Sequence, residues 1–125
     1  MQDNLYQLHQ SLLTLHKALL EFEKQQYEAI YGKITSPQEY LNLVIKHPAF
    51  AWLRSLSEAI VATDGLDKEE NRKPQQEILE TLKNLLIPNS EGSEFSKKYA
   101  VALQHSAEVA HAHGVTMQEL KNISQ

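Results

Sequence analysis

The stretch Leu5–Phe22, LYQLHQSLLTLHKALLEF, decides the fold of this chain. Its leucines recur in steps of three and four, at positions 5, 8, 12, 15 and 19, and Phe22 continues the series. Because these steps keep side chains on one side of a 3.6-residue turn, the stretch predicts an amphipathic helix whose apolar stripe is buried against partner helices. We expect this helix to cover residues 3–31 and to end at Gly32.

The rest of the chain has apolar residues at the same helical spacing. A second helix is expected from Ser36-Pro37 to His47, where Pro48 breaks or kinks it because proline lacks an N–H. A third helix is expected over residues 49–63, and its wide apolar arc places it at the centre of the fold. A charged connector over residues 66–73 follows it. The remaining predicted helices cover residues 74–87, 93–113 and 116–123, and Gly114 is expected to end the 93–113 helix.

These segments predict one all-α domain over residues 1–125. Its expected architecture is an antiparallel up-and-down bundle of four main helices, the second kinked at Pro48, plus a short C-terminal helix. A chain of 125 residues is long enough to bury a core of this kind.

Composition and charge argue against several classes of protein. The net charge is −4 and the basic residues are dispersed, which disfavours nucleic-acid binding. The absence of cysteine excludes disulfide scaffolds, thiolate catalysis and Cys-based zinc sites, and it fits a reducing compartment. The first residues lack the positive charge of a signal peptide, and no apolar run has the length of a membrane span. We therefore expect a cytoplasmic protein without nucleic-acid or membrane partners.

A line of polar side chains, His9, His16 and Glu23, runs along the middle of the apolar stripe. Residues seven apart on a helix are separated by about 10.5 Å, whereas metal–ligand distances are about 2 Å. These side chains therefore cannot share one ion without donors from another helix. A buried carboxylate also needs a partner. Two interpretations stay open: a packed polar layer that fixes helix register, which we favour, and a metal- or small-ligand-binding site inside the bundle.

Partners for the polar line are expected on neighbouring helices. If the helices alternate in direction, the 93–113 helix runs antiparallel to the first and brings Tyr99 close to Glu23. We predict the Tyr99 hydroxyl or Arg54 as the partner of Glu23. The candidate ligand-binding residues are His16, Glu23, Arg54, Tyr99 and His113.

Established catalytic motifs are missing from the sequence. It has no glycine-rich phosphate loop, no Gly-x-Ser-x-Gly elbow and no His-Glu-x-x-His. Glu108-Val109-Ala110-His111 is a single Glu-x-x-His motif on a polar face, whereas a di-iron site needs two such motifs and two further glutamates. The acidic connector lacks the ligand spacing of a calcium-binding loop. We therefore assign no catalytic residue, no metal ligands and no cofactor.

A set of residues spread over most of the chain carries a resemblance to known sequences. They are Pro48–Glu58 continuing through Ile60-Val61 to Asp64, Leu15-His16, Leu19-Leu20, Glu23, Phe95, Tyr99 and Ala102-Leu103. In these residues the sequence resembles a family of small uncharacterised bacterial helical proteins. The resemblance implies a bacterial cytosolic protein and supplies no activity.

The function that best fits these observations is a non-enzymatic interaction or binding module. Its partner is another protein or a second copy, held through surplus apolar surface on the first or last helix. The alternative is a bundle that binds a metal or small ligand with the inward-facing His and Glu side chains of the first helix. An enzyme is the third choice.

Overall fold

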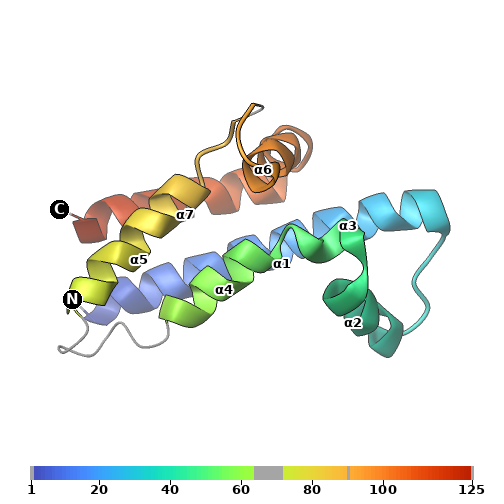
Figure 1. The fold of residues 1–125 in the computed structure, drawn as a ribbon, viewed down its shortest axis with the longest axis horizontal. Helices are drawn as coiled ribbons and strands as arrows, with labels where there is room; N and C mark the ends of the chain where they lie inside the picture. The colour runs from blue at the N-terminus through green and yellow to red at the C-terminus, as the bar shows by residue number, and fades with distance from the viewer. Residues whose placement is uncertain (1, 64–71, 90, 125) are drawn as a thin grey trace.

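The computed structural model describes residues 2–63, 72–89 and 91–124, and within these ranges the protein has seven helices and no strand (Figure 1). The all-α class is therefore confirmed. Residues 66–71 of the predicted connector lie outside the described ranges, and Arg72 already begins a helix. No helix in the described ranges is long and apolar enough to cross a membrane. The helices are α1 (Gln2–Tyr31), α2 (Pro37–Lys46), α3 (Pro48–Ala51), α4 (Arg54–Thr63), α5 (Arg72–Leu85), α6 (Glu94–His105) and α7 (Ala107–Ser124).

The core is built around α1, as the leucine spacing predicts. Helix α7 makes the most extensive packing contact with α1 and runs in the opposite direction, while α4 packs along another side of α1 (Figure 1). Burying a leucine side chain contributes about 1.5–3 kcal/mol, so the α1 stripe is a major source of stability. Its buried members are Leu8, Leu12, Leu15, Leu19 and Phe22, and those facing them from other helices include Leu56, Leu82, Tyr99, Val109 and Leu120.

The predicted 93–113 helix is broken in the structure at Ser106. Its backbone is extended, with φ −134° and ψ 114°, and its N–H donates to the Ala102 carbonyl at the end of α6. Its Oγ accepts a hydrogen bond from the Val109 N–H at 3.2 Å, which caps the start of α7. The single-helix prediction was wrong because one serine caps both ends of the break. In Figure 1, α6 is consequently seen almost end-on while α7 lies across the view.

Gly114 does not end a helix, contrary to the prediction. It lies inside α7, and the segment expected as a separate helix over 116–123 is the second half of α7. By contrast, Gly32 ends α1 with a positive φ of 96°, as glycine commonly does at a helix C-terminus.

Helices α2 and α3 are two separate helices rather than one kinked helix. His47 lies between them with φ −81° and ψ 135°, the extended conformation favoured by a residue that precedes proline. The Ser36 hydroxyl accepts from the Glu39 N–H at 3.1 Å, which caps the start of α2. In Figure 1, α2 projects away from the body formed by α1, α4, α5 and α7.

Candidate functional site

The three polar side chains on the buried side of α1, His9, His16 and Glu23, each contact a partner on the segment that contains α3 and α4. The pairs are His9 Nδ1 with Thr63 Oγ1 at 2.8 Å, His16 Nε2 with Ser57 Oγ at 2.7 Å, and Glu23 Oε1 with Trp52 Nε1 at 3.1 Å. Residue numbers rise along α1 as they fall along the partner segment, so the three pairs form a ladder between antiparallel elements. Displacing either element by one helical turn would break all three contacts. This geometry supports a packed polar layer that fixes helix register.

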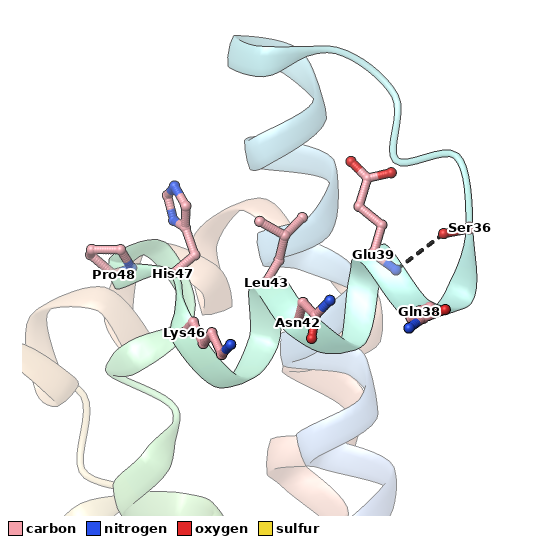
Figure 2. Close-up of a pocket in the computed structure, with 8 residues that line it drawn as sticks. All are labelled: Ser36, Gln38, Glu39, Asn42, Leu43, Lys46, His47 and Pro48. Carbon is pink, nitrogen blue, oxygen red and sulfur yellow. Dashed lines mark hydrogen bonds between the residues drawn. The ribbon is translucent and has the colours of Figure 1, made fainter.

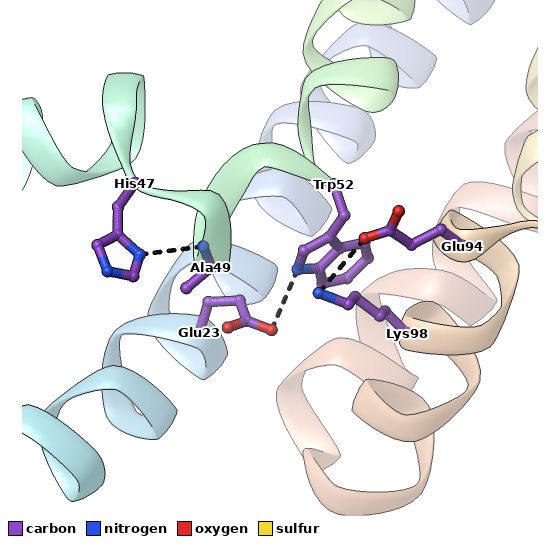
Figure 3. A network of polar contacts seen from close by, with 6 residues as sticks. All are labelled: Glu23, His47, Ala49, Trp52, Glu94 and Lys98. Atoms are coloured by element: carbon purple, nitrogen blue, oxygen red, sulfur yellow. Dashed lines mark hydrogen bonds and ion pairs between the residues drawn. The ribbon is translucent and has the colours of Figure 1, made fainter.

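Glu23 does not meet the partners that the sequence predicted. The Trp52 indole N–H donates to its carboxylate, in place of the Tyr99 hydroxyl or Arg54 (Figure 3). The prediction treated residues 93–113 as one helix, and the break at Ser106 turns α6 in another direction. Burial raises the pKa of Glu23, while the hydrogen bond from Trp52 and the positive charge of Lys98 act in the opposite direction.

Arg54 hydrogen-bonds to the backbone of α2 and not to Glu23, its predicted partner. Its guanidinium Nη2 donates to the Ile45 carbonyl at 3.3 Å, near the C-terminal end of α2. Arginine side chains near a helix C-terminus satisfy carbonyl groups that have no partner within the helix. Arg54 therefore tethers the end of α2 to the first residue of α4, and its predicted role as a partner of Glu23 is wrong.

Tyr99 and His113 are the two candidate residues that the structure brings together. The Tyr99 hydroxyl lies 2.6 Å from His113 Nδ1, and the Tyr99 side chain is fully buried. Burial raises the pKa of Tyr99 and lowers the pKa of His113. Both shifts favour the neutral forms, so the hydrogen bond joins a phenol to a neutral imidazole, whose tautomer decides which of the two groups donates. Phe95 stacks on Tyr99 with ring centroids 5.5 Å apart and connects it to the core.

The five candidate residues therefore do not form one site. His16, Glu23 and Arg54 each contact a different partner, and Tyr99 pairs with His113. Among the described residues, no group of three or more His, Asp or Glu side chains is arranged to hold a metal ion. Each of these side chains uses one of its hydrogen-bonding atoms on a partner within the chain.

Helix α2 differs from the rest of the molecule because none of its residues is buried. Leu41 is 58% exposed and Ile45, one turn later, is 54% exposed. Another side of α2 contacts the body through Tyr40, whose hydroxyl donates to the Leu20 carbonyl at 3.5 Å and whose ring lies 6.1 Å from Phe50. The spacing of the apolar residues predicts the helix, but it does not show which of them α2 leaves exposed.

An open cavity of about 590 Å³ lies beside α2. Figure 2 shows Glu39, Leu43 and His47 projecting from the same side of the helix. The His47 ring is held in place, because its Nδ1 accepts from the Ala49 N–H at 3.0 Å and the Tyr27 ring meets it edge-on at 5.2 Å. The cavity is lined by Ser36, Gln38, Glu39, Asn42, Leu43, Lys46, His47 and Pro48.

Two features are thus available to support a function: the polar pairs inside the bundle and the exposed side of α2. The polar pairs are satisfied by their own partners, whereas two large apolar side chains of α2 are more than half exposed. Both features are interpreted from their own geometry, because no protein-family model, curated protein sequence or solved structure matches this chain.

Proposed function

We propose that this protein is a non-enzymatic, cytoplasmic protein-interaction module. Its binding surface is the α2 face, defined here as the exposed apolar side chains Leu41 and Ile45. The observation that carries the proposal is that a ten-residue helix buries none of its residues. Helices of this length are marginal in water without packing partners. Exposed apolar residues one turn apart on a helix are the usual anchors when a helix lies in a groove or against another helix.

The rest of the protein acts as a scaffold in this proposal. An up-and-down bundle of α1, α4, α5 and α7 presents α2 at the end of α1, and the polar ladder holds α1 in register with α4. Two features support a fixed presentation of α2. Arg54 tethers the C-terminal end of α2, and the Glu39 Oε2 accepts hydrogen bonds from the Thr35 N–H and hydroxyl at its N-terminal end.

A bundle that binds a metal or small ligand is the alternative function. It has less support, because His16, Glu23 and His113 already have hydrogen-bond partners within the chain. Elemental analysis and an absorbance spectrum of the purified protein distinguish the two functions. Stoichiometric metal or a bound chromophore would favour the alternative.

Site-specific photocrosslinking in the cells that express the protein tests the proposed surface. A benzophenone amino acid at position 41 is expected to give a discrete crosslinked product. The matched control is the same probe at Val61, which is 68% exposed on α4. The proposal fails if position 41 gives no more crosslinked product than position 61.

A further inference from the structure

We propose that Trp52 and Tyr99 form a one-electron relay, in which Tyr99 receives an oxidising equivalent from Trp52 and keeps it as a neutral phenoxyl radical. Phe95 lies between the two, and Glu23 and His113 are their proton acceptors. The relay, defined by these five residues, does not depend on the α2 face. Its reaction partner is a one-electron oxidant, such as carbonate radical or a metal complex in its oxidised state.

The aromatic rings of the relay form a continuous path through the core. The ring centroids of Trp52 and Phe95 are 5.2 Å apart, and the rings of Phe95 and Tyr99 stack with centroids 5.5 Å apart. Aromatic side chains at these separations pack directly against each other. Because electron transfer slows steeply with distance, these two contacts give a short path from the only tryptophan of the chain to Tyr99.

Each of the two oxidisable side chains is hydrogen-bonded to a base. The Trp52 indole N–H donates to the Glu23 carboxylate at 3.1 Å (Figure 3), and the Tyr99 hydroxyl lies 2.6 Å from Nδ1 of His113. Loss of an electron turns an indole or a phenol into a much stronger acid, so its proton moves to a base within hydrogen-bond distance. Burial raises the pKa of Glu23, which makes its carboxylate a better proton acceptor.

The burial of Tyr99 determines which way its proton points. The Tyr99 side chain is fully buried, and within the described ranges His113 is the hydrogen-bond partner of its hydroxyl. If Nδ1 carried a hydrogen, the phenol hydrogen would be buried without an acceptor, which is unfavourable. The tautomer with its hydrogen on Nε2 avoids this, because Nδ1 then accepts from the phenol. Burial lowers the pKa of His113, but an oxidised phenol is acidic enough to protonate it.

Tyr6, Tyr31 and Tyr40 lack this combination of burial and a hydrogen-bonded base. The Tyr40 hydroxyl donates to the Leu20 carbonyl, which accepts a hydrogen bond but is too weak a base to take the proton. Tyr6 and Tyr31 are 62% and 63% exposed, so a radical formed on either of them meets water and solutes. A radical on Tyr99 is enclosed by the core and is therefore expected to last longer.

Electrons and protons balance in each step of the relay. Trp52 is 6% exposed whereas Tyr99 is fully buried, so the oxidant takes one electron from Trp52, and the indole proton moves to Glu23. One electron then passes from Tyr99 through Phe95 to the indolyl radical, which recovers its proton from Glu23. The phenol proton moves to Nδ1 of His113. The net products are the reduced oxidant, a Tyr99 phenoxyl radical and a His113 imidazolium.

Flash photolysis of the purified protein tests the relay. A flash on tris(bipyridine)ruthenium in the presence of persulfate generates a one-electron oxidant, and transient absorption separates the broad indolyl band from the sharper phenoxyl band. We expect the indolyl signal to decay as a long-lived phenoxyl signal appears. Electron paramagnetic resonance of frozen samples, with and without ring-deuterated tyrosine, identifies the long-lived radical as a tyrosyl.

Tyr99→Phe is expected to remove the long-lived phenoxyl signal and to slow the decay of the indolyl radical. It removes one hydroxyl and keeps the ring, so the variant is expected to fold, as circular dichroism would verify. Tyr31→Phe is the matched control. It removes an exposed phenol and is expected to leave the long-lived signal unchanged.

His113→Gln tests the role of the base. Glutamine can accept a hydrogen bond but cannot take up the proton, so the Tyr99 radical is expected to form about a hundredfold more slowly, as for the loss of a positioned base. Trp52→Phe is expected to lose most of the long-lived signal, because it removes the side chain that is oxidised first.

The relay is overturned if the long-lived phenoxyl signal survives in Tyr99→Phe, or if the indolyl radical decays equally fast in this variant and in the wild-type protein. Equal rates of radical formation in His113→Gln and in the wild-type protein would overturn proton transfer to His113. These results are independent of the crosslinking yield at position 41, so the relay and the α2 face are tested separately.

Discussion

The hydroxyl of Tyr99 lies 2.6 Å from Nδ1 of His113, and this bond joins α6 to α7 across the break at Ser106. The chain changes direction at a single residue between α6 and α7, and this hydrogen bond holds the two helices together on the buried side of the break. The buried surroundings of the pair favour the neutral imidazole, because burial lowers the pKa of His113.

The stability of the protein is therefore expected to fall as the pH drops. Burial lowers the pKa of His113 and of His16 below the ordinary value of 6.5. In the window between the lowered folded-state pKa and 6.5, the unfolded chain binds more protons than the folded protein, so the free energy of unfolding rises with pH. The contribution is complete above about pH 6.5. Urea denaturation at a series of pH values from 5 to 8 measures it.

His113→Gln is the matched variant, because glutamine offers an acceptor but does not titrate in this range. We expect it to make the free energy of unfolding less dependent on pH between 5 and 7. An unchanged slope would show that His113 does not contribute to the linkage.

Adjacent leucines of α1 are expected to differ sharply in their contribution to stability. Leu12 is completely buried, while Leu13 is 42% exposed. Leu12→Ala is expected to lower the free energy of unfolding by about 2–5 kcal/mol, because it leaves a cavity in the core. Leu13→Ala is expected to cost less than about 1 kcal/mol, because its side chain loses less burial on unfolding. Chemical denaturation of both variants checks the difference, and equal losses would contradict the assignment of the buried stripe.

The sequence contained enough information to place α1 and its buried side, because the leucine spacing is regular over five turns and a single face satisfies it. The break inside the predicted 93–113 helix could not be predicted from the sequence. Ser106 carries no strong signal in isolation, since serine is common both inside helices and at caps, and only its two hydrogen bonds identify the break. Conversely, Gly114 resembles a helix end in the sequence but lies within α7.

The polar contacts were only partly predictable. Spacing alone placed His9, His16 and Glu23 on one line, and the structure gives all three a partner on the same segment. The identity of each partner depends on how far α4 is rotated and shifted against α1, which no residue of α1 encodes. The incorrect prediction for Glu23 followed from this, because the spacing along α1 does not show that the Trp52 indole N–H reaches the carboxylate.

The contact between His16 and Ser57 is expected to be structural and measurable by a double-mutant cycle. Ser57→Ala removes the hydroxyl and leaves the half-buried imidazole without it, which is expected to cost about 1 kcal/mol. In a cycle with His16→Leu, the coupling energy is expected to be about 0.5–1.5 kcal/mol. Combining Ser57→Ala with His9→Leu, which belongs to a different rung of the ladder, is expected to give nearly additive effects. Additive effects in both cycles would mean that the rung between His16 and Ser57 contributes nothing to stability.

Gly114→Ala is expected to stabilise the protein by about 0.5–1 kcal/mol. Gly114 lies inside α7 without a positive φ, and an added Cβ would meet no atom within 4 Å. Alanine is favoured over glycine inside a helix by about this amount, because glycine loses more backbone freedom on folding. Gly32→Ala is the control and is expected to destabilise the protein by about 1 kcal/mol, since its φ of 96° is strained for any residue with a Cβ. Thermal and urea denaturation of both variants measures the two effects. A loss of stability in Gly114→Ala would contradict the open space beside Gly114. It would mean that this side of α7 packs against another molecule in solution, such as a second copy, and that α7 rather than α2 is the interaction surface.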